Sequence, residues 1–273
     1  MAQDHAGARR RPPRREDDSL DAFFDVPAAV LCAACGQADC PGCVAGSEQE
    51  SGVIAIVPWE RSGGTWTRLW ATATATTRGA EAFFAVLPDG DLPPAMRFAL
   101  LAELLAVASM AALLVPAVAL ALPGLTLALA NDPALRDRAM IWFALGVPAV
   151  AMWMILAHVT HGAALDLGAR RAGARAERRR AVRFGLYACG WDLVTGPLGA
   201  VVMLASHGLR ATIEIAQLAV TAPARASTAL LQGVYQLRAG EVARARRVGS
   251  AAAALIAVGT GLMVAIAISA AFE

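Results

Sequence analysis

Residues 98–122 read FALLAELLAVASMAALLVPAVALAL and contain one charged side chain, that of Glu103. A helix rises about 1.5 Å per residue, so roughly 20 apolar residues cross the hydrocarbon core of a bilayer. The run does not alternate, and an open sheet would leave backbone groups unsatisfied in lipid. This stretch therefore predicts a transmembrane helix, and with it an all-α membrane protein.

Four more apolar runs follow this one along the chain. Of the 273 residues 57% are hydrophobic and the mean hydropathy is +0.52, whereas soluble domains contain about 45–50% apolar residues. We therefore predict a polytopic transmembrane helix bundle over residues 95–273. Its five spans are expected at residues 98–122, 139–158, 184–205, 209–229 and 248–272. The fourth run carries four polar side chains, and reading it as an interfacial helix would leave four spans.

Two Arg-rich segments set the expected orientation, because cytoplasmic loops carry the excess of basic residues. The segment before the fifth span contains Arg238, Arg244, Arg246 and Arg247. The loop after the second span, which we expect to face anionic lipid headgroups, contains Arg170, Arg171, Arg175, Arg178, Arg179, Arg180 and Arg183. Five spans place both segments in the cytoplasm, with the N-terminus inside and the C-terminus outside. Four spans would place one of them outside.

The composition favours a bacterial source and hence the inner (cytoplasmic) membrane. All 24 basic residues are Arg, as in GC-rich coding. The N-terminal Arg cluster is followed by prolines and acidic residues rather than by the apolar segment of a signal peptide, so no export signal is expected.

Four regions are predicted ahead of the spans. Residues 1–27 are expected to form a disordered arm, 28–45 a cysteine element and 46–64 a linker. Residues 65–94 are predicted to hold an amphipathic interfacial helix, because aromatic and apolar side chains recur there at helical spacing. The alternative is a helix packed on the membrane domain.

The cysteine element contains two C-x-x-C pairs, formed by Cys32, Cys35, Cys40 and Cys43. Four thiolates suit a structural, tetrahedral Zn²⁺ site, and in a reducing compartment such a pattern indicates metal rather than disulfides. We predict a four-cysteine zinc element that folds a segment too short for its own core. An iron–sulfur cluster and a redox-active thiol pair stay open as alternatives.

Charged side chains inside a membrane are candidates for function. The predicted spans place Glu103, Asp192, Glu214 and Arg225 in a possible intramembrane polar site. Asp192 could carry a proton or cap a helix break at Gly190 or Gly196-Pro197, and the alternative is a polar tether between helices. His158 and His161 could share a metal, since residues three apart lie on one helix face, and interfacial histidines are the alternative. Cys189 is expected to be core packing.

The chain resembles bacterial Yip1-family membrane proteins over roughly residues 65–270. The residues that carry the resemblance are Trp66, Phe83-Phe84, Pro93-Pro94, Met96–Ala99, Tyr187, Pro197–Gly199 and Gly233–Tyr235. Five spans, a cytoplasmic N-terminus and a zinc-knuckle-like cluster fit that family. The resemblance implies a non-enzymatic protein of membrane organisation.

No nucleotide-binding, nucleophile-elbow or nucleic-acid-reading motif accompanies these features. The sequence therefore favours a non-enzymatic membrane scaffold or adaptor whose zinc element binds a cytoplasmic protein partner. Two alternatives remain. One is a small-molecule or ion transporter that uses the embedded acids. The other is a thiol-based redox or metal sensor.

Overall fold

A computed structural model describes residues 30–32, 53–55, 57–208 and 210–272. Near its N-terminal side, β1 (Val30–Cys32) pairs antiparallel with β2 (Val53–Ala55), and Leu31 lies opposite Ile54. A 3₁₀ turn, η3 (Pro58–Glu60), then leads into the helices. Everything described beyond this point is helical or connecting chain, so the all-α prediction is confirmed for the membrane domain.

The helices follow one another with short connections. In chain order they are α1 (Thr65–Thr77), α2 (Ala80–Ala85), α3 (Leu92–Ala121), α4 (Pro123–Asn131), α5 (Pro133–Arg171), α6 (Arg178–Ala188), α7 (Gly190–Thr195), α8 (Pro197–His207), α9 (Arg210–Gly233) and α10 (Ala239–Phe272).

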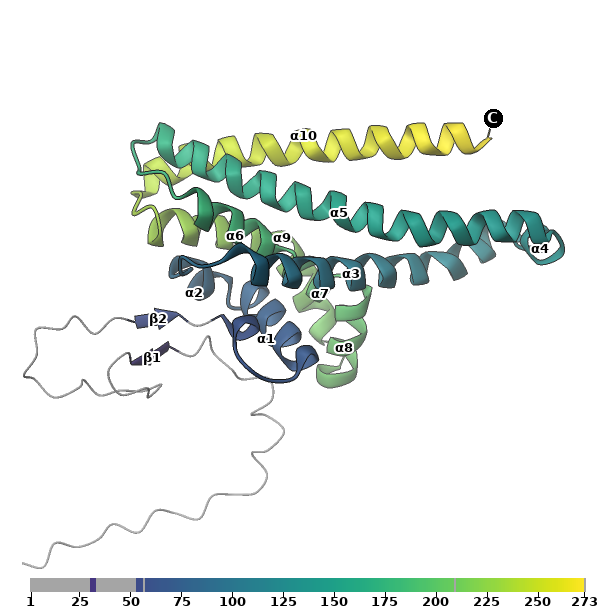
Figure 1. Ribbon diagram of the computed structural model, residues 1–273, viewed down its shortest axis with the longest axis horizontal. Coiled ribbons are helices and arrows are strands. Elements are labelled where there is room, and N and C mark those ends of the chain that lie inside the picture. The colour runs from purple at the N-terminus through teal and green to yellow at the C-terminus, as the bar shows by residue number, and fades with distance from the viewer. Residues whose placement is uncertain (1–29, 33–52, 56, 209, 273) are drawn as a thin grey trace, which may run out of the picture.

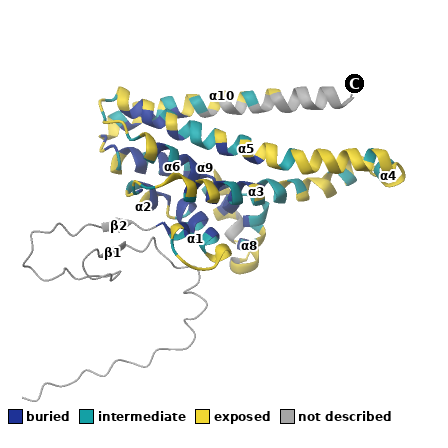
Figure 2. Cartoon of the chain, viewed as in Figure 1, coloured by how far each residue is buried: buried dark blue, intermediate teal, exposed yellow. Residues whose placement is uncertain are grey.

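Three long helices, α3, α5 and α10, project together from a packed end formed with the shorter helices (Figure 1). The first turns of α3 are buried, yet Leu113 and Leu120 farther along it are exposed. In α5 the order is reversed, since Trp142 is 74% exposed and Leu165 is fully buried. Figure 2 shows the exposed half of both helices extending toward α4. An apolar surface of this extent marks contact with lipid or another apolar partner.

In the described part of the chain, α3 and α5 are long and apolar enough to cross a membrane. A third crossing is available if residues 178–195 and 197–206 form one broken span, because these two segments meet at an angle of 59°. The predicted third span is therefore not one straight helix. It is interrupted at Cys189 and again at Gly196, where Pro197 starts α8 without a backbone N–H donor. The five-span arrangement remains a prediction.

The predicted amphipathic helix is also interrupted. It forms α1 and α2, which are separated at Arg78 and Gly79. Leu69 and Phe84 are fully buried against the bundle, whereas Trp66 is exposed and stacks on Trp70 at 6.2 Å. The two helices are thus packed on the membrane domain, which is the alternative left open from the sequence.

An aromatic core holds the packed end together. Phe84 lies 4.7 Å from Phe184 and 6.2 Å from Trp191, and Phe98 lies 5.4 Å from Tyr187, measured between ring centroids. These rings come from α2, α3, α6 and α7, so the core joins the segment before the membrane domain to the broken helix pair. Aromatic pairs at such distances add about 0.5–1.5 kcal/mol beyond their buried area.

Candidate functional site

Three carboxylate and imidazole side chains meet at the centre of the packed end. His158 of α5 places Nε2 2.8 Å from Oδ2 of Asp192 on α7 and 3.5 Å from Oε1 of Glu103 on α3. The Cys189 thiol lies beside them, because one ligand atom each of Glu103, His158 and Cys189 falls within 4.8 Å of the others. We call Glu103, His158, Cys189 and Asp192 the four-residue cluster.

Local packing fixes where the members of the cluster stand. The His158 ring meets Trp191 edge to face at 5.6 Å, and the Trp191 indole N–H donates to the Thr76 carbonyl at 2.9 Å. On the other side, α5 and α6 approach closely, since a Cβ on Gly185 would lie 2.5 Å from the His158 carbonyl oxygen. Glycine is needed at such a backbone approach. Cys189 and Asp192 are thereby brought to the same turn of α5 as His158.

The Glu103 carboxylate is the unusual member of the cluster. Its side chain has no exposed surface, and its polar neighbours are His158, Asp192 and Cys189, although neither of its oxygens makes a hydrogen bond of good geometry. Leaving a buried polar group unpaired costs about 1–3 kcal/mol or more, so such a group calls for an explanation. The Asp192 side chain is 30% exposed, so this member of the cluster reaches the surface of the described chain.

The donor set of the cluster fits a divalent transition-metal ion. Carboxylate, imidazole and thiolate are the ligands that Zn²⁺ and its neighbours take in proteins. The donors come from α3, α5 and α7 and from Cys189, which lies between α6 and α7, and the buried Glu103 carboxylate would gain a counter-charge. Bonds to Zn²⁺ are about 2.0–2.3 Å long, so the four side chains would close around the ion by rotamer adjustments.

The possible intramembrane site predicted from the sequence divides into two parts. Glu103 and Asp192 come together through His158, as a shared polar centre. Glu214 instead pairs at 3.2 Å with Arg78, which lies between α1 and α2, and Arg225 pairs with Glu81 of α2 at 2.8 Å. These two ion pairs are solvent-accessible and attach the short helices to α9.

The two histidines do not converge on a common ion. Nε2 of His161 lies 3.2 Å from the Ser227 hydroxyl, and Nδ1 lies 3.3 Å from the Gly249 carbonyl oxygen. His161 thus joins α5 to α9 and α10, while His158 serves the cluster. The H-x-x-H spacing singled out His158. The side chains around His158 are the Glu103 and Asp192 carboxylates and the Cys189 thiol.

Most arginines of the basic loop are exposed, and their predicted contact with lipid headgroups stays a prediction. Arg171, Arg175, Arg178 and Arg179 are exposed, and Arg170 makes an ion pair with Asp166 at 3.0 Å. Arg183 is different, because its side chain is buried rather than facing lipid. The helical period of α6 turns it inward, where it meets Glu60 and the Asp91 carbonyl.

Two buried polar contacts had no signal in the sequence. One joins Arg183 and Tyr187 to Glu60, and the other joins the Tyr235 hydroxyl to Asp166 at 2.9 Å. Each links residues far apart in the chain, so only the fold brings them together.

The cysteine element falls largely outside the described residues. Cys32 ends β1, and Cys35, Cys40 and Cys43 lie in the undescribed stretch that follows. The zinc prediction is therefore untested. A comparison of this chain with protein-family models, with curated proteins and with solved structures finds no match. The Yip1-family resemblance accordingly stays a prediction.

Proposed function

We propose that this protein is an integral membrane protein that binds a divalent transition-metal ion at the four-residue cluster. One observation carries the proposal, namely that the fully buried Glu103 carboxylate, the His158 imidazole and the Cys189 thiol place one ligand atom each within 4.8 Å of one another. Glu103 and Asp192 of the cluster are two of the embedded acids that the transporter alternative used in the sequence analysis. Among the functions expected from the sequence, the proposal therefore favours transporting or sensing a metal ion.

The cluster also occupies a suitable place for ion movement. It lies where the apolar halves of α3 and α5 begin, and α6–α7 bends away from α8 immediately beside it. Broken helices and embedded acids are the features by which membrane transporters hold ions. Asp192 would receive the ion from the surface, and Glu103 would hold it inside the bundle.

Metal binding is tested on the purified full-length protein, with Cys32, Cys35, Cys40 and Cys43 replaced by Ser to remove the predicted zinc element. After chelation and equilibration with Co²⁺, we expect one ion per chain and a thiolate-to-cobalt absorption band. The Glu103→Gln and His158→Gln variants should lose the ion, and Cys189→Ser should lose the band.

Glu214→Gln is the matched control, because this acid belongs to the same domain but forms a separate surface ion pair. It should bind Co²⁺ as the parent protein does. A parent protein without bound ion, or binding that survives Glu103→Gln, would exclude the cluster as a metal site. Metal flux into proteoliposomes, compared between the parent and Glu103→Gln, then separates transport from sensing.

A further inference from the structure

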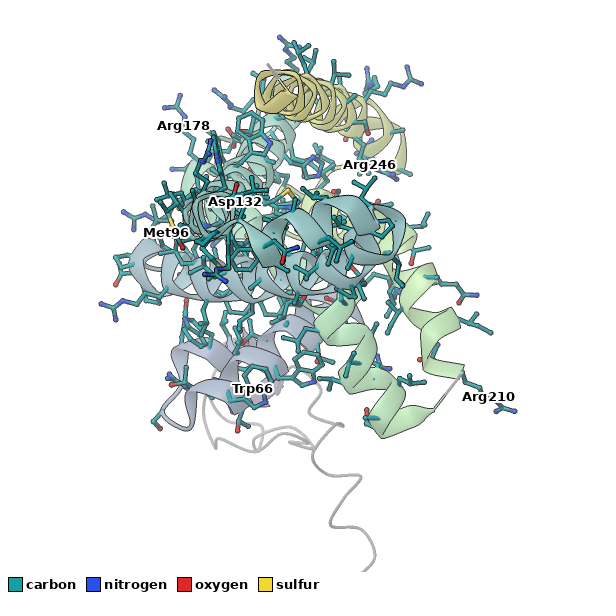
Figure 3. The ribbon with its side chains drawn as sticks, turned by 90° about the vertical axis from the view of Figure 1, so that its right-hand side faces the viewer. Trp66, Met96, Asp132, Arg178, Arg210 and Arg246 are labelled. Atoms are coloured by element: carbon teal, nitrogen blue, oxygen red, sulfur yellow. The ribbon has the colours of Figure 1, made fainter. Side chains whose placement is uncertain are left out.

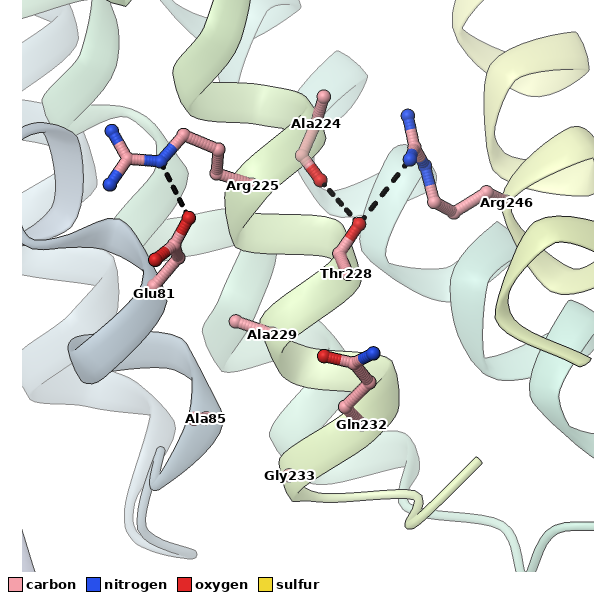
Figure 4. Close-up of a pocket in the computed structure, with 9 residues that line it drawn as sticks. All are labelled: Glu81, Ala85, Ala224, Arg225, Thr228, Ala229, Gln232, Gly233 and Arg246. Carbon is pink, nitrogen blue, oxygen red and sulfur yellow. Dashed lines mark hydrogen bonds and ion pairs between the residues drawn. The ribbon is translucent and has the colours of Figure 1, made fainter. Parts of the chain in front are cut away.

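A second site lies away from the cluster, in a pocket between α2, α9 and α10. Its volume is about 550 Å³, and its polar lining residues are Glu81, Arg225, Thr228, Gln232 and Arg246. Most of the lining comes from one face of α9, because Arg225, Thr228, Ala229 and Gln232 are spaced three and four residues apart. Figure 4 shows Arg246 reaching this face from α10 and Glu81 approaching it from α2.

The pocket has more positive than negative charge. Two guanidinium groups line it against one carboxylate, that of Glu81. Arg225 donates through Nε to Glu81 at 2.8 Å, and Arg246 donates through Nη1 to the Thr228 hydroxyl at 3.3 Å. A guanidinium carries five N–H donors, so each arginine keeps several for a ligand. Arg246 makes no ion pair with another described residue.

Gln232 adds an uncharged donor to the two arginines. Its side chain is exposed at the pocket and makes no hydrogen bond to the rest of the described chain. The Thr228 hydroxyl, in contrast, is engaged, since it donates to the Ala224 carbonyl at 2.8 Å and accepts from Arg246. The free donors of the pocket are therefore guanidinium and amide groups, which suit an oxyanion with several acceptor oxygens.

We propose that this pocket binds a phosphate group, carried either by an anionic lipid headgroup or by a small soluble phosphate. Arginine forks match phosphate oxygens in pairs, which favours phosphate over a simple halide. The position agrees with a headgroup, because the pocket adjoins the Arg-rich start of α10. Basic pockets between membrane helices on the cytoplasmic side, where the Arg-rich segments are predicted to lie, bind lipid headgroups. The site is independent of the metal proposal.

The test measures binding to the full-length protein in a nonionic detergent by calorimetry. One arm titrates inorganic phosphate, and the other titrates a short-chain phosphatidic acid, with short-chain phosphatidylcholine as the zwitterionic control. We expect saturable binding in at least one anionic arm, about tenfold weaker in Arg246→Gln and in Arg225→Gln. Glu81→Gln should tighten binding, because the opposing carboxylate is removed.

Two neighbouring arginines supply matched controls. Arg244 and Arg247 lie on the same stretch of α10 but do not line the pocket, so Arg244→Gln and Arg247→Gln should change the dissociation constant less than twofold. Binding of phosphate itself identifies a soluble ligand, and binding of phosphatidic acid alone identifies a lipid. The proposal is overturned if neither arm saturates, or if the control variants weaken binding as much as Arg246→Gln does.

Discussion

Arg183 and Glu60 form an ion pair, buried on the arginine side, that joins the chain ahead of the helices to the middle of α6. The Arg183 Nη2 atom lies 2.7 Å from Oε1 of Glu60, and the arginine side chain is 1% exposed. The same carboxylate oxygen accepts a hydrogen bond from the Tyr187 hydroxyl at 2.6 Å. The pair, with Trp59 packed on Phe98 at 5.8 Å, anchors η3 to the membrane domain.

Removing the carboxylate of this pair should destabilise the protein. In Glu60→Ala the Arg183 charge stays buried without its counter-ion, which costs about 3 kcal/mol, the lower end of the range for buried pairs, because Glu60 is 27% exposed. Glu60→Gln keeps an oxygen acceptor and should lose less. Thermal unfolding in detergent, followed by circular dichroism, measures the difference.

The matched control for this change is Glu214→Ala. In its ion pair with Arg78 neither side chain is buried, since Glu214 is 59% and Arg78 is 29% exposed, and surface pairs contribute about 0–1 kcal/mol. If Glu60→Ala and Glu214→Ala lower the unfolding temperature equally, the Glu60–Arg183 pair is not the anchor described here.

A close helix crossing supports the four-residue cluster, and it can be disturbed by one methyl group. A Cβ on Gly185 would lie 2.5 Å from the His158 carbonyl oxygen and 2.6 Å from the Val159 Cα, both of them backbone atoms. Gly185→Ala should therefore push α6 away from α5 and destabilise the protein by about 1–3 kcal/mol. Gly146→Ala on α5 is the control, because no atom lies within 4 Å of the added Cβ. Equal unfolding temperatures for the two variants would contradict the crossing.

Alkaline pH should weaken the contact between Tyr235 and Asp166. Burial and the Asp166 carboxylate raise the pKa of Tyr235 well above its ordinary value of about 10. A raised pKa favours the protonated phenol in the folded state. Its contribution to stability is therefore fully present below about pH 10 and is lost as the pH rises beyond that value through the folded-state pKa.

The Tyr235→Phe variant isolates this contribution. At neutral pH the variant should be less stable by about 1 kcal/mol, the usual value of one hydrogen bond. The gap to the wild type should narrow above about pH 10. Stability measured across this range is easy to interpret, because the chain contains no Lys and its 24 basic residues are all Arg, which stay charged there. If the stability difference between the wild type and Tyr235→Phe stays constant with pH, the Tyr235 phenol is not the source of that difference.

The sequence predicted the helices better than it predicted their continuity. The long apolar runs located α3 and α5 correctly, because a run of that length with few or no charges indicates a membrane-spanning helix. The breaks at Cys189 and Gly196 were considered only as one possible role of Asp192, because the apolar pattern continues across them although Gly190, Gly196 and Pro197 disfavour a continuous helix. Only the backbone bend between α7 and α8 distinguishes a broken span from a straight one.

The candidate site could be predicted only in part, because its members are recognisable one by one but their contacts depend on tertiary packing. Glu103 and Asp192 were recognisable as charges in apolar runs, and His158 as half of a histidine pair. Their meeting depends on how α3, α5 and α7 pack, which one-dimensional spacing does not contain. Glu214 and Arg225 looked equally embedded, but their partners, Arg78 between α1 and α2 and Glu81 on α2, place them in separate ion pairs. The adaptor role depends on the cysteine element and remains a prediction, to be tested by crosslinking wild type and the Ser variant.

The orientation predicted from the Arg-rich segments can be tested without settling the number of spans. Figure 1 shows the end of α5 and the start of α10 at the same end of the bundle, with α4 at the other. Figure 3 looks along the bundle from the α4 end, with Asp132 near the centre and Arg178 and Arg246 labelled on other helices. Both Arg-rich segments therefore lie on the same side of the membrane, whether α6–α9 cross it twice or not at all.

Cysteine labelling in intact cells checks this arrangement. In the background with Ser at the four N-terminal cysteines, Asn131→Cys at the end of α4 should react with a membrane-impermeant maleimide. Arg175→Cys, in the connection between α5 and α6, should react only after the cells are permeabilised, because the positive-inside rule keeps this segment in the cytoplasm. Cys189 is fully buried, so the background itself should stay unlabelled. The reverse pattern would invert the orientation, and labelling of both positions from outside would exclude α5 as a membrane span.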